Sequence, residues 1–132
     1  MKGRKPNVVP LRKGAPIGRC PSAPDWLCAD ARREWSKTAP ILHQRGLLGP
    51  DTSPTLENYC TAVAQIREFE AVMAAEGRIV QTEHGLKAHP AFRLQHVAIA
   101  AARLLACELG ISPYRRGKHE EPKPDAWEGL LS

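Results

Sequence analysis

The sequence has no apolar run of 18 or more residues, and its basic N-terminus is not followed by the apolar stretch that a secretory signal requires. We therefore expect no membrane-spanning helix and a cytoplasmic protein. Aromatic residues are also scarce, at 5% of 132 residues, so a core must be built mainly from alanine, leucine and valine. This length and composition suit one small domain.

The motifs that catalysis, metal binding or redox chemistry would need are missing. There is no GxxxxGK[ST] phosphate loop, the acidic residues form no recognisable metal-binding signature, and the histidines at positions 43, 84, 89, 96 and 119 lack a ligand motif. The gaps between the cysteines, 8, 32 and 47 residues, match neither a zinc ribbon nor a CxxC pair, and we expect reduced, mostly buried thiols at Cys20, Cys28, Cys60 and Cys107. We predict a protein that is not an enzyme and that needs no metal and no cofactor.

Acidic residues are absent from residues 1–24, which contain six basic residues, whereas residues 25–132 hold 13 basic and 14 acidic residues. Five prolines and three glycines exclude a continuous helix in the first segment, so we predict a flexible, disordered arm. Basic arms of this kind commonly bind polyanions. The arm residues that we assign to DNA binding are Lys2, Arg4, Lys5, Arg12, Lys13 and Arg19.

Residues 29–45 are predicted to form the first helix, because apolar or small positions recur at spacings of 4, 3 and 4, at Ala31, Trp35, Thr38 and Leu42. Trp26 and Trp35 are expected to pin this helix to the core. Pro40 removes a backbone donor and is expected to kink or briefly break the helix, and Gly46 is expected to end it.

The first helix also offers a second candidate DNA surface, formed by Arg32 and Arg33 with Lys37, which would belong to a helix-turn-helix made with the second helix. Asp30 and Glu34 balance these charges, and a solvated helical face is the commoner explanation for such a mixture. We keep Arg32 and Arg33 as secondary candidates for DNA binding.

Residues 52–76 are predicted to form the longest helix, which would measure roughly 38 Å at 1.5 Å per residue. A heptad-like apolar stripe runs along it at Leu56, Tyr59, Val63, Ile66 and Met73. Cys60, Phe69 and Val72 widen this apolar face beyond what the adjacent hairpin can cover. We assign the stripe to contacts between subunits, and a wide core face in a monomeric bundle is the alternative.

Residues 78–89 are predicted to form one β-hairpin, with strand-favouring Ile79, Val80 and Thr82 before a turn at Glu83-His84-Gly85. A two-stranded hairpin is marginally stable in water on its own, so it needs a helix to pack on or strands from a neighbouring chain. We assign Ile79 and Val80 to assembly.

Pro90 is predicted to open a third helix that ends at Gly110 and carries apolar residues at Leu94, Val97, Ala98, Ala101, Leu104 and Leu105. The fold class is therefore mainly α, with three principal helices and one hairpin between the second and the third. The helical core is expected to span residues 25–116, including a short turn after Ser112-Pro113.

Residues 117–132 are predicted to form a flexible tail, in which a charged, proline-containing spacer leads to an apolar tip. A single helical turn would place the apolar residues of this tip on one side, at Trp127, Leu130 and Leu131. Such a tip either docks in a groove of a partner or folds back on its own chain.

The order of these landmarks resembles the small subunit of phage terminases, over almost the whole chain. The resemblance is carried in sequence by Lys2-Gly-Arg-Lys-Pro6, by Pro24-Asp-Trp-Leu27 before Glu34-Trp35, by Arg45-Gly-Leu-Leu48 with Asp51, by Ala75-Glu-Gly77 with Leu86-Lys-Ala-His-Pro90, and by Glu108-Leu-Gly-Ile-Ser-Pro113 with Arg116. Cys28-Ala29 departs from the Ser-Pro type of helix start that is usual in the family, which weakens the expected cap.

The resemblance implies a non-catalytic, ring-like homo-oligomer that recognises double-stranded viral DNA and hands it to the large terminase subunit for packaging. It implies that Trp127, Leu130 and Leu131 contact that large subunit. It also implies a protein that acts in the host cytoplasm during phage assembly and is absent from the mature virion. A small phage transcriptional regulator, expected to be a dimer on a palindrome, is the alternative, and a virion connector component is a third hypothesis.

Overall fold

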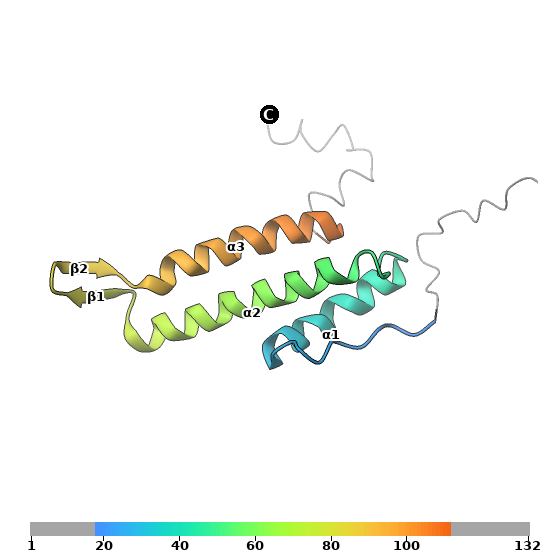
Figure 1. Ribbon diagram of the computed structural model, residues 1–132, viewed down its shortest axis with the longest axis horizontal. Helices are drawn as coiled ribbons and strands as arrows, with labels where there is room; N and C mark the ends of the chain where they lie inside the picture. The colour runs from blue at the N-terminus through green and yellow to red at the C-terminus, as the bar shows by residue number, and fades with distance from the viewer. Residues whose placement is uncertain (1–17, 112–132) are drawn as a thin grey trace, which may run out of the picture.

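The computed structural model describes residues 18–111 and contains three helices and one hairpin (Figure 1). The elements are, in chain order, α1 (Ala29–Gln44), α2 (Ser53–Glu76), β1 (Ile79–Thr82), β2 (Gly85–Ala88) and α3 (Pro90–Leu109). The prediction of a mainly α fold with a hairpin between the second and third helices is confirmed. The predictions for residues 1–17 and 112–132 lie outside the described residues.

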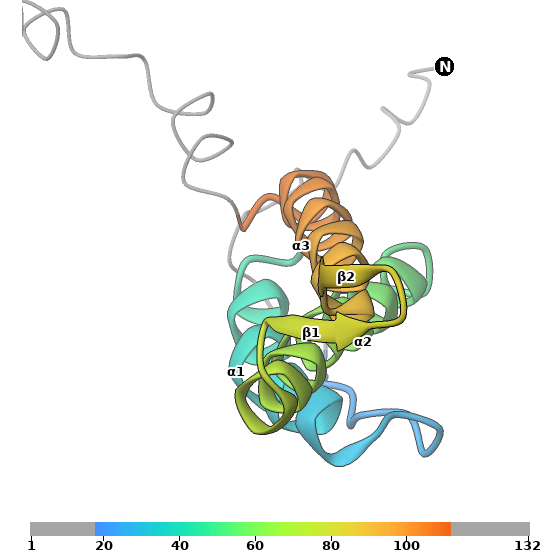
Figure 2. The same ribbon diagram turned by 90° about the vertical axis from the view of Figure 1, so that its left-hand side faces the viewer.

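Helix α2 is the central element. Helix α3 runs beside α2 along its length, α1 lies on the other side of α2 and covers only part of it, and the hairpin projects beyond one end of the helices (Figures 1 and 2). The short turn between α1 and α2 and the hairpin between α2 and α3 each reverse the chain. The result is a helical layer with a hairpin that no helix covers.

The main core lies between α1 and the N-terminal half of α2, with the end of α3 closing it. Its buried side chains form one contiguous cluster: Leu27, Ala31, Trp35, Ala39, Leu42, Leu56, Cys60, Ala64 and Leu109. Burial raises the pKa of the Cys60 thiol to about 12, with a smaller contribution from the Glu34 carboxylate. Only Cys60 of the four cysteines is fully buried, since Cys28 is exposed and Cys20 and Cys107 are half-buried, so the prediction of mostly buried thiols is wrong.

Helix α1 continues without a break through Pro40. Pro40 and Ser36 are both exposed. The carbonyl that loses its donor at this position therefore faces solvent, where water can satisfy it, and the predicted break does not occur.

The two tryptophans near α1 behave differently. Trp35 is buried, and its Nε1 donates a hydrogen bond of 3.0 Å to the carbonyl of Pro21. Trp26 is 60% exposed, because the turn before α1 directs the neighbouring Leu27 into the core instead. The prediction that both tryptophans anchor the helix is correct for Trp35 and wrong for Trp26.

The segment 18–28 lies against α1, held by side chains of that helix. His43 Nε2 lies 2.9 Å from the carbonyl oxygen of Gly18, and Arg32 donates to the carbonyls of Leu27 and Asp25 at 3.0 and 2.9 Å. These contacts begin before residue 25, where the sequence predicted that the ordered core starts. The backbone of the last part of the predicted arm is thus fixed along α1.

Small residues form the contact between α3 and α2. Ala91, Ala98 and Ala102 are buried on one face of α3, at spacings that a seam between two helices requires. Gln95 is buried within the same seam and donates to the carbonyl of Ile66 at 3.2 Å and to the Glu70 carboxylate at 2.8 Å. A left-handed Gly110, with φ 75°, ends α3. Within residues 18–111, no helix combines the length and the apolar character that crossing a bilayer requires.

Because only one of them is buried in the core, two adjacent residues of α1 should differ sharply in how much they contribute to the free energy of unfolding. Leu42→Ala removes a fully buried side chain and should lower the free energy of unfolding by about 2–5 kcal/mol. Ile41→Ala, which truncates a 43% exposed neighbour, should cost less than about 1 kcal/mol. Urea denaturation at one fixed protein concentration, followed by circular dichroism, measures both, and equal losses would contradict this position of the core.

Candidate assembly and DNA-binding surfaces

Helix α3 carries a second apolar stripe that no described residue covers. Leu94, Val97 and Leu104 are 52–63% exposed, and Ala101 completes their spacing of 3, 4 and 3. This spacing places them on one side of the helix, distinct from the seam of Ala91, Ala98 and Ala102. We call Leu94, Val97, Ala101 and Leu104 the α3 stripe.

The hairpin exposes one apolar face. The strands are antiparallel with Ile79 opposite Ala88 and Gln81 opposite Leu86, so these four residues share a face. Ile79 is 67% and Leu86 71% exposed, whereas Val80 on the other face is half-buried. Ile79 and Val80, which the sequence grouped as one assembly element, therefore point in opposite directions.

A polar network fixes the hairpin to the helices. The Glu70 carboxylate accepts from Gln95 of α3 and forms an ion pair with Arg78, directly before β1. The hydrogen bond from Gln95 is the largest cause that lowers the pKa of Glu70 below its ordinary value of 4.5, and the Arg78 guanidinium adds to it. The network connects α2, α3 and the start of the hairpin at one point.

His89 connects the other end of the hairpin to α3. Its Nδ1 accepts a hydrogen bond of 2.9 Å from the backbone N–H of Ala91, and its Nε2 lies 3.0 Å from the Glu76 carboxylate. The imidazole thus caps α3 while contacting the end of α2. The sequence placed His89 at the end of the hairpin but missed the cap, because histidine is not among the usual N-cap residues.

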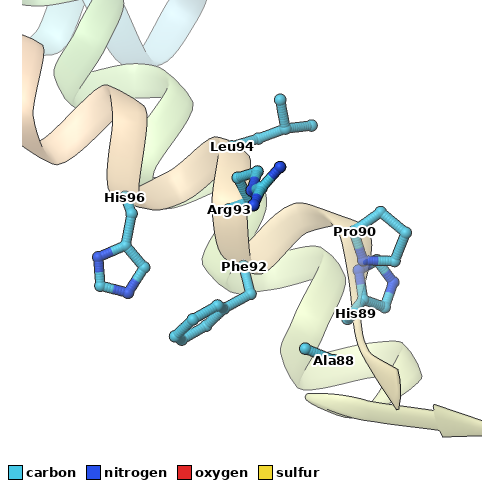
Figure 3. A pocket seen from close by; sticks show the side chains of 7 residues that line it. All are labelled: Ala88, His89, Pro90, Phe92, Arg93, Leu94 and His96. Carbon is cyan, nitrogen blue, oxygen red and sulfur yellow. The ribbon is translucent and has the colours of Figure 1, made fainter. Parts of the chain in front are cut away.

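An open hollow of about 720 Å³ lies where β2 meets α3 (Figure 3). It is lined by Ala88, His89, Pro90, Phe92, Arg93, Leu94 and His96. Phe92 and His96 lie on one side of α3 in an edge-to-face contact, with ring centroids 4.4 Å apart, and Leu94 points to the other side. The hollow is continuous with the α3 stripe through Leu94 and with the hairpin face through Ala88.

Most side chains of the apolar stripe predicted on α2 pack against other parts of the same chain. Leu56 and Met73 are 0% and 1% exposed, so neither offers a surface to another subunit, and their assignment to assembly is corrected. Tyr59 is half-buried, and its hydroxyl donates to Glu34 of α1 at 3.4 Å. Burial, followed by the charge of Glu34, raises the pKa of Tyr59 above 10.0. The physical reason for the correction is that α1 and α3 cover two sides of α2, leaving Val63 and Ile66 half-buried.

The signal for the missed surface was present in the sequence. The apolar residues of the predicted third helix include Ala98 and Leu105 as well as Leu94, Val97, Ala101 and Leu104. Only the last four have the 3-4-3 spacing of a separate stripe. Ala98 belongs to the buried seam. The surplus apolar surface therefore lies on α3 and the hairpin instead of on α2.

The arginines of the first helix are occupied by contacts within the chain. Arg32 pairs with Asp25 at 3.6 Å in addition to its two backbone hydrogen bonds, and Arg33 pairs with Asp30 at 3.3 Å. Arg19 and Lys37 are exposed. The other predicted sites, Lys2, Arg4, Lys5, Arg12 and Lys13 for DNA and Trp127, Leu130 and Leu131 for the large subunit, lie outside the described residues. In residues 18–111, no three His, Cys, Asp or Glu side chains converge as a metal site would require.

The polar network predicts how acid affects stability. Because the folded-state pKa of Glu70 is depressed, its stabilising contribution is fully present above pH 4.5 and is lost as the pH falls through the lower folded value. Glu70→Gln should therefore unfold more easily than the wild type at pH 7, and the two should converge as the pH falls below 4.5. Urea denaturation across this range measures the difference, with Glu83→Gln in the hairpin turn as the control. A difference for Glu70→Gln that does not change with pH would contradict the role of this carboxylate.

Comparison with known proteins gives one match. A model of the family described as phage terminase, small subunit, matches residues 31–126. No curated protein and no solved structure matches the chain. The family match covers α1, α2, the hairpin and α3 and extends into the predicted tail. The chain therefore belongs to the phage terminase small subunit family.

Proposed function

We propose that the chain is the DNA-recognition adaptor of a phage packaging machine, a non-catalytic homo-oligomer that binds the viral genome and delivers it to the large terminase subunit. The family match over residues 31–126 carries this proposal, because the small subunit is the component of terminases that serves in packaging without performing the catalysis. The protein would act in the host cell during assembly and leave before the virion is complete.

The distribution of charge supports the N-terminal arm as the main DNA contact. Residues 18–111 contain ten basic and ten acidic residues, and residues 112–132 contain four of each. The net charge of +5 thus arises from residues 1–17, which carry five basic residues and no acid: Lys2, Arg4, Lys5, Arg12 and Lys13. Since Arg32 and Arg33 are paired with carboxylates, α1 offers a weaker site for phosphates.

The exposed apolar surfaces support assembly. The α3 stripe and the hairpin face bring exposed leucine, isoleucine and valine side chains to the surface over much of the molecule. Contiguous apolar patches on a soluble protein commonly mark protein contacts. We propose that Ile79, Leu86 and the α3 stripe contact neighbouring copies, and that the apolar tip at Trp127, Leu130 and Leu131 serves the large subunit.

Two truncations test the separation of these roles. If the six cations of the arm, including Arg19, engage phosphates, log affinity against log salt concentration should have a slope of about −5, at −0.9 per phosphate. Deleting residues 2–17 removes five of the six cations but spares the Gly18 contact with His43, and should flatten the slope by about 4 to 5 units. Deleting residues 126–132 should leave the slope unchanged.

For the large subunit we expect the opposite result, in which the tail truncation has the effect and the arm truncation does not. The tail truncation should abolish the effect of this chain on the ATPase rate of the large subunit, while the arm truncation retains it when no DNA is present. Filter binding and an ATPase assay measure the two properties on the same three proteins. An unchanged salt slope after removal of the arm would show that the arm is not the DNA contact.

A further inference from the structure

Helices α2 and α3 carry opposite charges on surfaces that face away from each other. Glu57 and Glu68 on α2 form no ion pair within residues 18–111, and neither do Arg93 and Arg103 on α3. The other acidic residues of α2 are engaged, Glu70 with Arg78 and Glu76 with His89. Within residues 18–111, α2 therefore keeps two unpaired acidic residues, and α3 keeps two unpaired arginines together with the exposed, unpaired Glu108 near its C-terminal end.

The helical repeat places both pairs away from the α2–α3 contact. On α2, Glu68 is exposed, and the half-buried Glu57 lies beside the face that α1 covers at Leu56, Cys60 and Ala64. At about 100° per residue, Glu57 and Glu68 lie roughly 140–180° around α2 from Ile66 and Glu70, which contact Gln95 of α3. Arg93 and Arg103 lie roughly 110–170° around α3 from the seam that faces α2. The acidic and basic pairs cannot meet within one chain. An edge-to-edge arrangement of two copies brings them together.

The spacing of the two pairs matches. Arg93 and Arg103 are ten residues apart, or about 15 Å, and Glu57 and Glu68 are eleven residues apart, or about 16.5 Å. Glu57 and Glu68 are separated by about three full turns, so they lie on nearly the same line along α2. Both pairs therefore span the same length of helix.

The heights of the two pairs also agree. Gln95 contacts Ile66 and Glu70, and His89 contacts Glu76, which fixes how far each α3 residue lies along α2. Measured along the axis of α2, Arg93 is then offset by about 3–6 Å from Glu68, and Arg103 by about 4–8 Å from Glu57. Both offsets point towards the hairpin end. Extended arginine and glutamate side chains can span such an offset when a second copy stands beside the first in the same orientation.

Apolar side chains accompany the charges. Val97 of the α3 stripe lies one turn from Arg93 on the helix surface, and Leu104 lies about 16.5 Å further along the helix from Arg93, with the small Ala100 between Val97 and Leu104. On α2, the half-buried Val72 and the exposed Ala75 lie on the side of Glu68. Small and aliphatic residues beside matched charges permit close helix contact and exclude water from the ion pairs.

We propose that α3 of one copy packs against α2 of the next copy, with Arg93 opposite Glu68 and Arg103 opposite Glu57. This contact rests on the self-assembly in the proposed function and names the surfaces that meet. Because the two surfaces differ, the contact is heterologous, so it repeats from copy to copy and closes into a ring where the rotation permits.

Charge reversal in two separate variants tests the pairing. Arg93→Glu with Arg103→Glu makes both edges acidic, and Glu57→Arg with Glu68→Arg makes both edges basic. Each variant alone should need about tenfold or more higher protein concentration to assemble, because two attractive contacts become repulsive. An equimolar mixture should assemble at the wild-type concentration, with even subunit numbers, since the two variants complement each other at both edges. The fourfold swap in one chain should also restore assembly.

Native mass spectrometry over a dilution series measures these states, and circular dichroism checks that each variant is folded. Lys37→Glu with Asp51→Arg, which reverses exposed charges on α1 and in the α1–α2 turn, is the control and should assemble normally. A wild-type chain that is monomeric at every concentration would overturn the assembly in the proposed function and this contact with it. A wild-type oligomer that both reversal variants form equally well would overturn this contact alone. Loss of DNA affinity in the arginine variant at an unchanged subunit count would also overturn it, and would assign Arg93 and Arg103 to phosphates.

Discussion

The difference in length between α1 and its partners is the constraint on which the other features depend. The 16 residues of α1 span about 24 Å, whereas the 24 residues of α2 span about 36 Å. Helix α1 therefore builds a dry core against one half of α2 only, with Leu42, Leu56 and Cys60 fully buried there. At the other end, the α2–α3 pair and the hairpin keep their outer faces exposed. A fold of this kind buries enough for one small domain and leaves apolar surface for another molecule.

Charge is distributed differently in residues 18–111 and in residues 1–17. Within residues 18–111 the acidic and basic residues are equal in number, and four ion pairs, together with the hydrogen bond between His89 and Glu76, connect elements or stabilise helix ends. Glu34 is an example, since it accepts from Tyr59 and pairs with Arg67 across the α1–α2 contact. The cations in excess belong to residues 1–17, as an adaptor needs if its folded part contacts copies of itself and its arm contacts DNA. Membership of the terminase small subunit family is consistent with both contacts.

Local chemistry in the sequence predicted the elements well, because turn and cap signals depend on neighbouring residues. Glu83-His84-Gly85 marked the hairpin, and Pro90 and Gly110 marked the ends of α3 within one residue. Periodicity was less informative about contacts, since it shows that a helix face is apolar but not which neighbour covers it. Periodicity alone therefore assigns Leu56 and Met73 to an outer surface and does not separate the α3 stripe from the buried seam. The exposure of Trp26 depends on the direction of one turn, which composition does not determine.

Hydrogen exchange of the hairpin, measured at increasing protein concentration, tests the central claim most directly, namely that other copies cover the exposed surface. The two strands have no helix over their apolar face, so their amides should exchange quickly in the monomer. We expect protection of residues 79–88 to rise as the chain assembles, while protection in the α1–α2 core stays constant. Rapid exchange in the hairpin at concentrations where the protein is fully oligomeric would contradict the account.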